Sequence, residues 1–214
     1  GNCRSVHCGH LLLLPLSNKL GLAKFSAQVK ARHRFKYDFA DILCKLVMCR
    51  ILFPDSKRAT RECLNDFIDA PDFSLDDIYN FLGTLSKEIT PLQRSIYEAT
   101  KNELSRRTGV IYYDCTNYYF EIEKEDNLRR YGKSKEHRPN PIVQMGMFMD
   151  ADGIPLAFSV FDGNQNEQPS MSPLEQKIIK DFETSDFIVC TDAGLSSTTN
   201  RKFNSIQGRG FVTT

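Results

Sequence analysis

The chain has 214 residues, of which 41% are hydrophobic and 26% are charged. These proportions are typical of a globular protein with an ordinary core, and they exclude a disordered or fibrous chain. The formal net charge of +1 at pH 7 also excludes a uniformly basic or acidic protein.

Charge is unevenly divided along the sequence. Residues 1–110 hold 17 Lys and Arg against 12 Asp and Glu, whereas residues 111–214 hold 11 against 15. This division suits a first part that meets polyanions and a second part that holds cations, although charge alone proves neither. The seven cysteines are odd in number and lie mostly in apolar runs, which indicates free thiols in a reducing compartment, by default the cytoplasm.

The first segment, Leu11 to Leu14, resembles the core of a signal peptide, but Pro15 ends the run after four leucines. No apolar run is long enough to span a membrane, so we expect no membrane partner. Helical periodicity and capping signals then predict four helices, over residues 37–53, 56–67, 75–87 and 91–107. Residues 1–108 are therefore expected to form a helical N-terminal region with a role in DNA binding or dimerisation.

Two basic clusters lie in this region, at residues 30–36 and at Lys57, Arg58 and Arg61. Each is consistent either with phosphate contacts or with an ordinary solvated surface, and the second reading is the commoner one for charge runs. No helix-turn-helix signature is visible, so no particular helix is assigned to a DNA groove.

After Gly109 the pattern changes to strands. Residues 110–121 are rich in aromatic and β-branched side chains, and residues 142–149 and 154–161 flank an Asp-Gly turn that predicts a hairpin. A helix over residues 169–182, a strand over 187–191, a helix from Ser196 or Ser197 to Ile206 and a strand from Phe211 follow. The expected fold class is mixed α/β.

Two aspartates stand out because they interrupt or end apolar strands. Asp114 lies in the middle of the first predicted strand, and Asp192 follows the fourth. A carboxylate in an apolar strand is costly to bury unless a counter-ion or a metal offsets its charge. Two such carboxylates predict a shared divalent cation.

Four segments also carry a resemblance to a known family: Tyr112–Glu121, Tyr131–Pro139, Asp152–Ala157 and Thr191–Leu195. Together they resemble bacterial insertion-sequence transposases of the DDE type, whose catalytic domain has an RNase H-like fold. The resemblance implies that residues 109–214 are the first part of such a domain and that Asp114 and Asp192 are two of its catalytic, metal-binding carboxylates. It further implies two Mg²⁺ or Mn²⁺ ions, DNA partners in the form of transposon ends and target, a homodimer, and a cytoplasmic, nucleoid-associated location.

The third carboxylate of the family is a glutamate on a helix after the fifth strand. The sequence stops at Thr214, on the strand predicted to be the fifth, and Glu167, Glu175 and Glu183 come too early. We therefore expect an N-terminal or central fragment that lacks this glutamate and is inactive by itself.

The loop after the first strand holds Lys133, Lys135 and Arg138, which the resemblance places near the active site as DNA-phosphate contacts. A plain surface loop is the alternative. The rival to an enzyme fragment is a catalytically dead remnant that binds DNA or a full-length transposase. A third reading, an unrelated phosphatase or nuclease, would need an Asp-x-Asp or a histidine cluster near the strands, and neither is seen.

Overall fold

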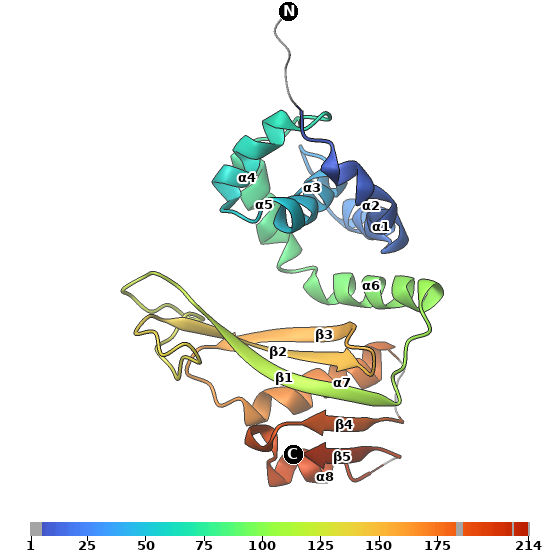
Figure 1. Cartoon of the computed structure of the whole chain (residues 1–214), viewed down its shortest axis with the longest axis vertical. Helices are drawn as coiled ribbons and strands as arrows, with labels where there is room; N and C mark the ends of the chain where they lie inside the picture. Colours follow the sequence, from blue (N-terminus) through green and yellow to red (C-terminus); the bar gives the residue numbers. More distant parts are fainter. Residues whose placement is uncertain (1–5, 183–185, 207, 214) are drawn as a thin grey trace, which may run out of the picture. The chain divides into compact units, whose positions relative to one another are not determined.

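The computed structural model describes residues 6–182, 186–206 and 208–213. The chain divides into two compact units, Gly1–Leu104 and Ser105–Thr214. The first unit is helical and runs from blue to green in Figure 1. Its elements, in chain order, are η1 (Gly9–Leu12), α1 (Leu14–Lys19), α2 (Leu22–Arg32), α3 (Phe39–Leu52), α4 (Lys57–Cys63), η2 (Leu64–Asp66), α5 (Leu75–Leu85) and α6 (Ile89–Glu103).

Side chains cap the starts of three predicted helices, and the caps expected at Ser56 and Ser74 are confirmed. The Asp38 side chain accepts a hydrogen bond from the backbone amide of Ala40 at 2.9 Å at the start of α3, and Ser56 caps α4. Ser74 and Asp77 form a reciprocal capping box at the start of α5. These side chains satisfy backbone amides that the first helical turn leaves without a partner.

The sequence prediction missed α1 and α2. Pro15 lies in the first turn of α1, where a proline lacks only an amide that the helix does not use. At the end of α2, Arg32 and the following His33 both contact the buried Glu88, at 2.6 and 3.1 Å. The hydrogen bond from Arg32 lowers the pKa of Glu88. Arg32 and His33 of the first basic cluster therefore pair with a carboxylate of the same helical unit.

The second unit is built on a five-stranded mixed sheet. Its strands are β1 (Val110–Tyr119), β2 (Ile142–Asp150), β3 (Pro155–Asp162), β4 (Ile188–Thr191) and β5 (Gly210–Thr213), in the spatial order β3-β2-β1-β4-β5. β1 is antiparallel to β2 and parallel to β4. The predicted mixed α/β class, with a mixed sheet, flanking helices and a helical N-terminal region, is confirmed.

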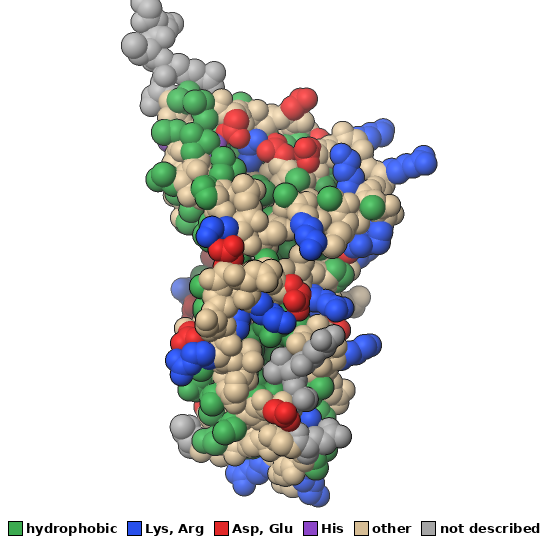
Figure 2. All heavy atoms as spheres, turned by 90° about the vertical axis from the view of Figure 1, so that its right-hand side faces the viewer, with side chains coloured by type: hydrophobic (Ala, Val, Ile, Leu, Met, Phe, Trp, Pro, Cys, Tyr) green, Lys and Arg blue, Asp and Glu red, His purple; other side chains and the backbone are tan. Residues whose placement is uncertain are grey.

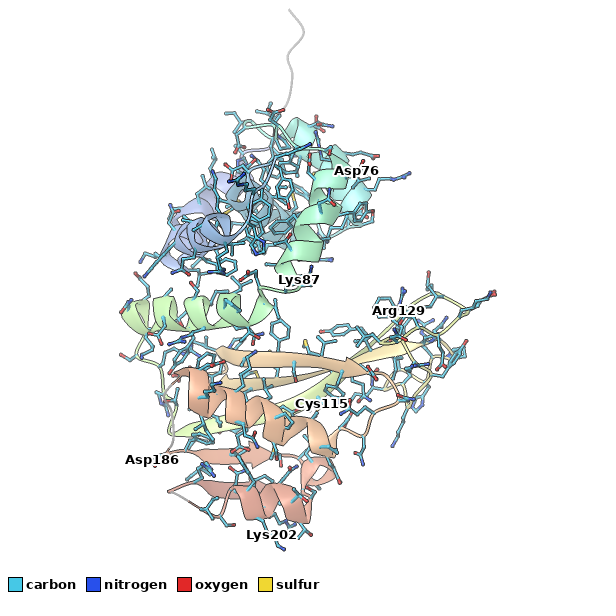
Figure 3. The ribbon with its side chains drawn as sticks, turned by 180° about the vertical axis from the view of Figure 1, so that it is seen from behind. Asp76, Lys87, Cys115, Arg129, Asp186 and Lys202 are labelled. Atoms are coloured by element: carbon cyan, nitrogen blue, oxygen red, sulfur yellow. The ribbon has the colours of Figure 1, made fainter. Side chains whose placement is uncertain are left out.

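One face of the sheet is covered by helices. Along β1 the side chains of Ile111, Tyr113 and Cys115 are buried, and the hydroxyls of Tyr113 and Ser170 lie 2.6 Å apart. Ser170 ends η3 (Gln168–Ser170), which leads into α7 (Met171–Phe182), and α7 contacts α8 (Thr198–Phe203). Figure 3 shows α7 crossing this face. The Tyr113 ring lies over Gly146 of β2, where a Cβ atom would meet the Tyr113 hydroxyl at 2.0 Å.

The opposite face carries exposed side chains on three neighbouring strands. Tyr112 of β1, Ile188 of β4 and Val212 of β5 are 45%, 41% and 52% exposed. Since side chains alternate along a strand, Asp114, two positions after Tyr112, belongs to the same face. Asp192, one residue after the end of β4, is expected on this face as well.

A buried ion pair joins the segment before β1 to the β2–β3 hairpin. The prediction extended the last helix to residue 107, but α6 ends at Glu103, and Arg106 donates to the Asp150 carboxylate at 2.6 Å. Both side chains are almost fully buried. Asp150 also accepts from the backbone amides of Asp152 and Ile154, which closes the predicted turn at Gly153.

No helix in the described part of the chain is long and apolar enough to cross a membrane. Figure 2 shows a group of hydrophobic side chains in the upper part of one face. Leu11, Leu12 and Leu16 are among the exposed hydrophobic residues of the described chain. Basic and acidic side chains are interspersed over the rest of that face. The charge division seen in the sequence therefore forms no single-sign surface there.

Replacing one partner of the buried pair should strongly destabilise the sheet unit. Arg106→Ala leaves the Asp150 carboxylate buried without its counter-ion, so we expect the free energy of unfolding to fall by about 3–5 kcal/mol. Arg107→Ala is the matched control, because Arg107 pairs with Asp152 in solvent and its loss should cost less than about 1 kcal/mol. Urea denaturation of both variants measures this, and equal losses would contradict the assignment.

Candidate functional site

Asp114 lies in the middle of β1, as predicted, but its side chain is exposed. The expectation that the charge is buried in a core strand was wrong, because Asp114 shares the uncovered face of the sheet with Tyr112. One carboxylate oxygen, Oδ1, accepts a hydrogen bond from the next backbone amide, that of Cys115, at 2.7 Å. The carboxylate is thus accessible to a ligand.

Asp192 follows the last residue of β4 and is also exposed. Its backbone remains extended, with φ −73° and ψ 168°, and it caps the short turn η4 (Ala193–Leu195). The Asp192 Oδ1 atom accepts from the backbone amide of Leu195 at 3.2 Å. Asp192 therefore continues the path of β4 for one residue before the chain turns.

The register between β1 and β4 relates the two aspartates. These strands are parallel neighbours, and their last registered pair is Tyr112 with Cys190. Two residues further along each strand are Asp114 and Asp192. Because neighbouring strands lie about 4.8 Å apart and residues i and i+2 share a face, we expect the two carboxylates to lie side by side on one face if this register continues to Asp114 and Asp192.

The chemistry of this pair fits a hard divalent cation. Among the described residues, neither carboxylate forms an ion pair. Two negative charges at adjacent strand positions repel each other, and a cation with oxygen ligands would offset that repulsion. Within residues 6–182, 186–206 and 208–213, no group of three or more His, Cys, Asp or Glu side chains is placed to hold a metal. The candidate site consists of two carboxylates.

The predicted DNA contacts lie on a loop that is attached to the end of β1 just beyond Asp114. The side chain of Asn117 donates to the carbonyl of Lys133 at 3.4 Å and accepts from the amide of Lys135 at 3.3 Å. The Lys135 ammonium donates to the Cys115 carbonyl. Arg138 lies over the Tyr119 ring at 4.9 Å. The three basic residues are therefore held near the strand that carries Asp114.

A polar cavity of about 680 Å³ separates this loop from the turn that follows β3. Lys133, Lys135 and His137 line one side, and residues 163–167 line the other, with Gly194 at the edge nearest Asp192. His137 has a positive φ of 55°, which is uncommon for a residue other than glycine. The cavity brings basic side chains and the Asp192 loop to one place.

Sequence reasoning missed Gln144, which shapes this cavity. Its buried amide nitrogen donates to the carbonyls of Gly163 and Gln165, at 3.0 and 2.5 Å, and so fixes the turn after β3. A single polar residue within the apolar run of β2 is a signal that could have identified it. Asn200 and Gln168, which contact the Asp192 loop, carried no such signal because they lie in polar segments.

Glu175 does not join the aspartate pair. It lies on α7, which covers the opposite face of the sheet, and it is fully buried. Burial raises its pKa to about 7, although Asn204, which donates to Glu175 Oε2 at 3.0 Å, and the positive charge of Arg209 act in the opposite direction. Glu175 is therefore a buried acid of the α7–α8 packing.

No protein-family model matches the chain, and no curated protein sequence matches it. Among solved structures it is similar to a piggyBac transposase synaptic complex with hairpin DNA, with 12% identity and a TM-score of 0.45 over 99% of this chain and 51% of that chain. It is also similar to a Mos1 transposase paired-end complex with the left transposon end, with 10% identity and a TM-score of 0.32 over 79% and 56%.

A third similar structure is a Mos1 mariner paired-end complex with Mn, with 10% identity and a TM-score of 0.33 over 84% of this chain and 59% of that chain. The chain thus spans between about half and three fifths of the length of these proteins. Likeness at this level concerns the fold alone.

The raised pKa of Glu175 makes stability depend on pH. The folded protein binds the Glu175 proton more tightly than the unfolded chain does, so this contribution is complete below about pH 4.5 and is lost as pH rises to about 7. Relative to Glu175→Gln, which cannot titrate, the wild type should lose roughly 3 kcal/mol of unfolding free energy across this window. Denaturation of both proteins at several pH values measures the difference, and a pH-independent difference would contradict the assignment.

Proposed function

We propose that Asp114 and Asp192 hold a divalent cation, Mg²⁺ or Mn²⁺, and that the chain serves DNA strand cleavage and strand transfer as part of a DDE-type transposase. One observation carries the proposal: two accessible carboxylates without ion-pair partners follow the registered segments of parallel strands β1 and β4. The order β3-β2-β1-β4-β5 and the four sequence segments that resemble the family support it further.

Each aspartate has a distinct structural basis for its proposed role. Asp114 is fixed by the pairing of β1 with β2, in which it lies opposite Met147, and Asp192 is fixed by the turn that its own side chain caps. Rigid carboxylates lose little freedom when they bind a hard cation. When bound, such cations activate an attacking oxygen and stabilise a leaving oxygen in phosphoryl transfer.

Lys133, Lys135 and Arg138 are proposed to bind the phosphates of the DNA backbone. They lie on the loop that borders the cavity or next to it, and Asn117 ties that loop to β1. Contacts of this kind position a duplex without reading its sequence. The DNA partners in this proposal are transposon ends and target DNA, and two copies of the protein would hold two ends.

The rival proposal is a protein that binds DNA, or a complete transposase, without cutting. In this rival proposal the basic loop still binds DNA, but the two aspartates catalyse no strand cleavage. Incubation of the chain with Mn²⁺ and DNA that carries the sequences flanking its coding region distinguishes the two. Nicked product that disappears with Asp114→Asn supports cleavage by this site and contradicts the expectation that the chain is inactive by itself. DNA binding with neither product nor Mn²⁺ binding by the two aspartates supports the rival.

The metal assignment predicts that either aspartate is needed for cation binding. Asp114→Asn or Asp192→Asn should weaken Mn²⁺ binding at least tenfold, because each removes one anionic ligand and leaves the fold intact. Asp152→Asn is the control, since Asp152 is an exposed turn carboxylate that pairs with Arg107. Electron paramagnetic resonance of free Mn²⁺ measures the affinities. Unchanged binding by both site variants would refute the assignment.

The loop assignment predicts a salt-dependent loss of DNA affinity. Each lost phosphate contact should reduce the slope of log K against log salt by about 0.9, so a Lys133→Ala/Lys135→Ala variant should lose nearly two units of slope. Lys180→Ala/Lys202→Ala removes the same charge from exposed positions on α7 and α8 and should change the slope little. Fluorescence anisotropy at several salt concentrations measures the slopes, and equal changes in both variants would point to a general charge effect.

A further inference from the structure

Two side-chain amides hold the loop that follows Asp192. The Asn200 Nδ2 group donates to the carbonyls of Leu195 and Gln168, at 2.9 and 3.0 Å. The Gln168 Nε2 group donates to the carbonyl of Gly194 at 3.0 Å. We refer to Asn200 and Gln168, with these three bonds, as the Asn200 clamp. It joins α8 and η3 to the turn that begins at Asp192.

Leu195 links the clamp directly to the Asp192 carboxylate. The Leu195 backbone amide donates to Asp192 Oδ1 at 3.2 Å, while the carbonyl of the same residue accepts from Asn200. A change in the Asn200 side chain therefore affects Leu195, whose backbone amide orients the Asp192 carboxylate. No other side chain needs to move for this effect to reach Asp192.

Asn200 is itself fixed on all sides. Its side chain is 1% exposed, its Oδ1 atom accepts from the Ser172 hydroxyl of α7 at 3.1 Å, and its backbone amide is capped by Ser197. In Figure 3, α8, where Lys202 is labelled, lies beside α7. A buried amide with all its bonds made is a rigid support.

We propose that Asn200 is a positioning residue that orients the Asp192 carboxylate toward the divalent cation shared with Asp114. This inference rests on the proposed function, because it assigns a role toward that cation. Residues outside the first coordination sphere that orient a ligand change metal affinity by about 10–100-fold when they are removed. Asn200 acts through Leu195, so it is not itself a ligand.

The chain offers a matched control in Asn204. This second asparagine lies one turn after Asn200, is fully buried, and donates to Glu175 Oε2 and to the Asn200 carbonyl, at 3.0 and 3.2 Å. Its side chain makes no hydrogen bond to residues 192–195. Asn200→Ala and Asn204→Ala should therefore lower the thermal stability of the metal-free protein similarly, while only Asn200→Ala changes the Asp192 loop.

The test is Mn²⁺ binding by the full chain, followed by electron paramagnetic resonance. We expect the Mn²⁺ dissociation constant to rise about tenfold for Asn200→Ala and to stay within about twofold for Asn204→Ala. Equal weakening by both variants, or none by Asn200→Ala, overturns the positioning role. If the wild type itself binds no Mn²⁺, the proposed function fails and this inference fails with it.

Gln168→Ala keeps the proposal testable if Asn200→Ala does not fold. Gln168 is only partly buried, so its truncation removes the bond to Gly194 with little cost to the core. We expect a smaller rise of the dissociation constant, about threefold, since the bond between Asn200 and Leu195 remains. An unchanged dissociation constant in this variant also counts against the clamp.

Discussion

The parallel ladder between β1 and β4 is the constraint on which the candidate site depends. Its registered pairs end at Tyr112 and Cys190, and each aspartate follows two residues later, Asp114 within β1 and Asp192 just after β4. Because side chains alternate along a strand, a slip of one residue would turn one carboxylate to the covered face. The buried partners Ile111 and Val189 oppose such a slip, since it would expose apolar side chains that are now fully buried.

The helices that cover one face of the sheet make it rigid, and this rigidity holds the side chains on the exposed face in place. Behind the sheet, α7 and α8 are joined by buried polar groups, among them Glu175, Asn200 and Asn204. Buried polar groups of this kind specify one arrangement, because each loses its partner if the helices shift. Before the start of β1, the buried ion pair between Arg106 and Asp150 likewise fixes the arrangement of the β2–β3 hairpin. Polar networks outside the site thus support the sheet that carries Asp114 and precedes Asp192.

Local signals allowed much of the fold to be predicted from the sequence. The Ser74 capping box, the Asp-Gly turn at residues 152 and 153 and the spacing of α7 depend on nearby residues, and each was confirmed. The end of α6 was not predictable, because Arg106 leaves the helix for a partner 44 residues away. The exposure of Asp114 could not be predicted from the sequence, because Tyr112 and Tyr113 make both faces of β1 appear apolar. Asn200 gave no signal, since its partners come from three separate segments.

The central claim is that Asp114 and Asp192 share one cation site on the uncovered face of the sheet. Crystals of the protein grown with Mn²⁺, with diffraction data collected at the manganese absorption edge, test it most directly. The account predicts an anomalous peak bonded to carboxylate oxygens of both aspartates, and its absence in Asp192→Asn crystals. A peak at another group of side chains, with none between these two aspartates, would contradict the account.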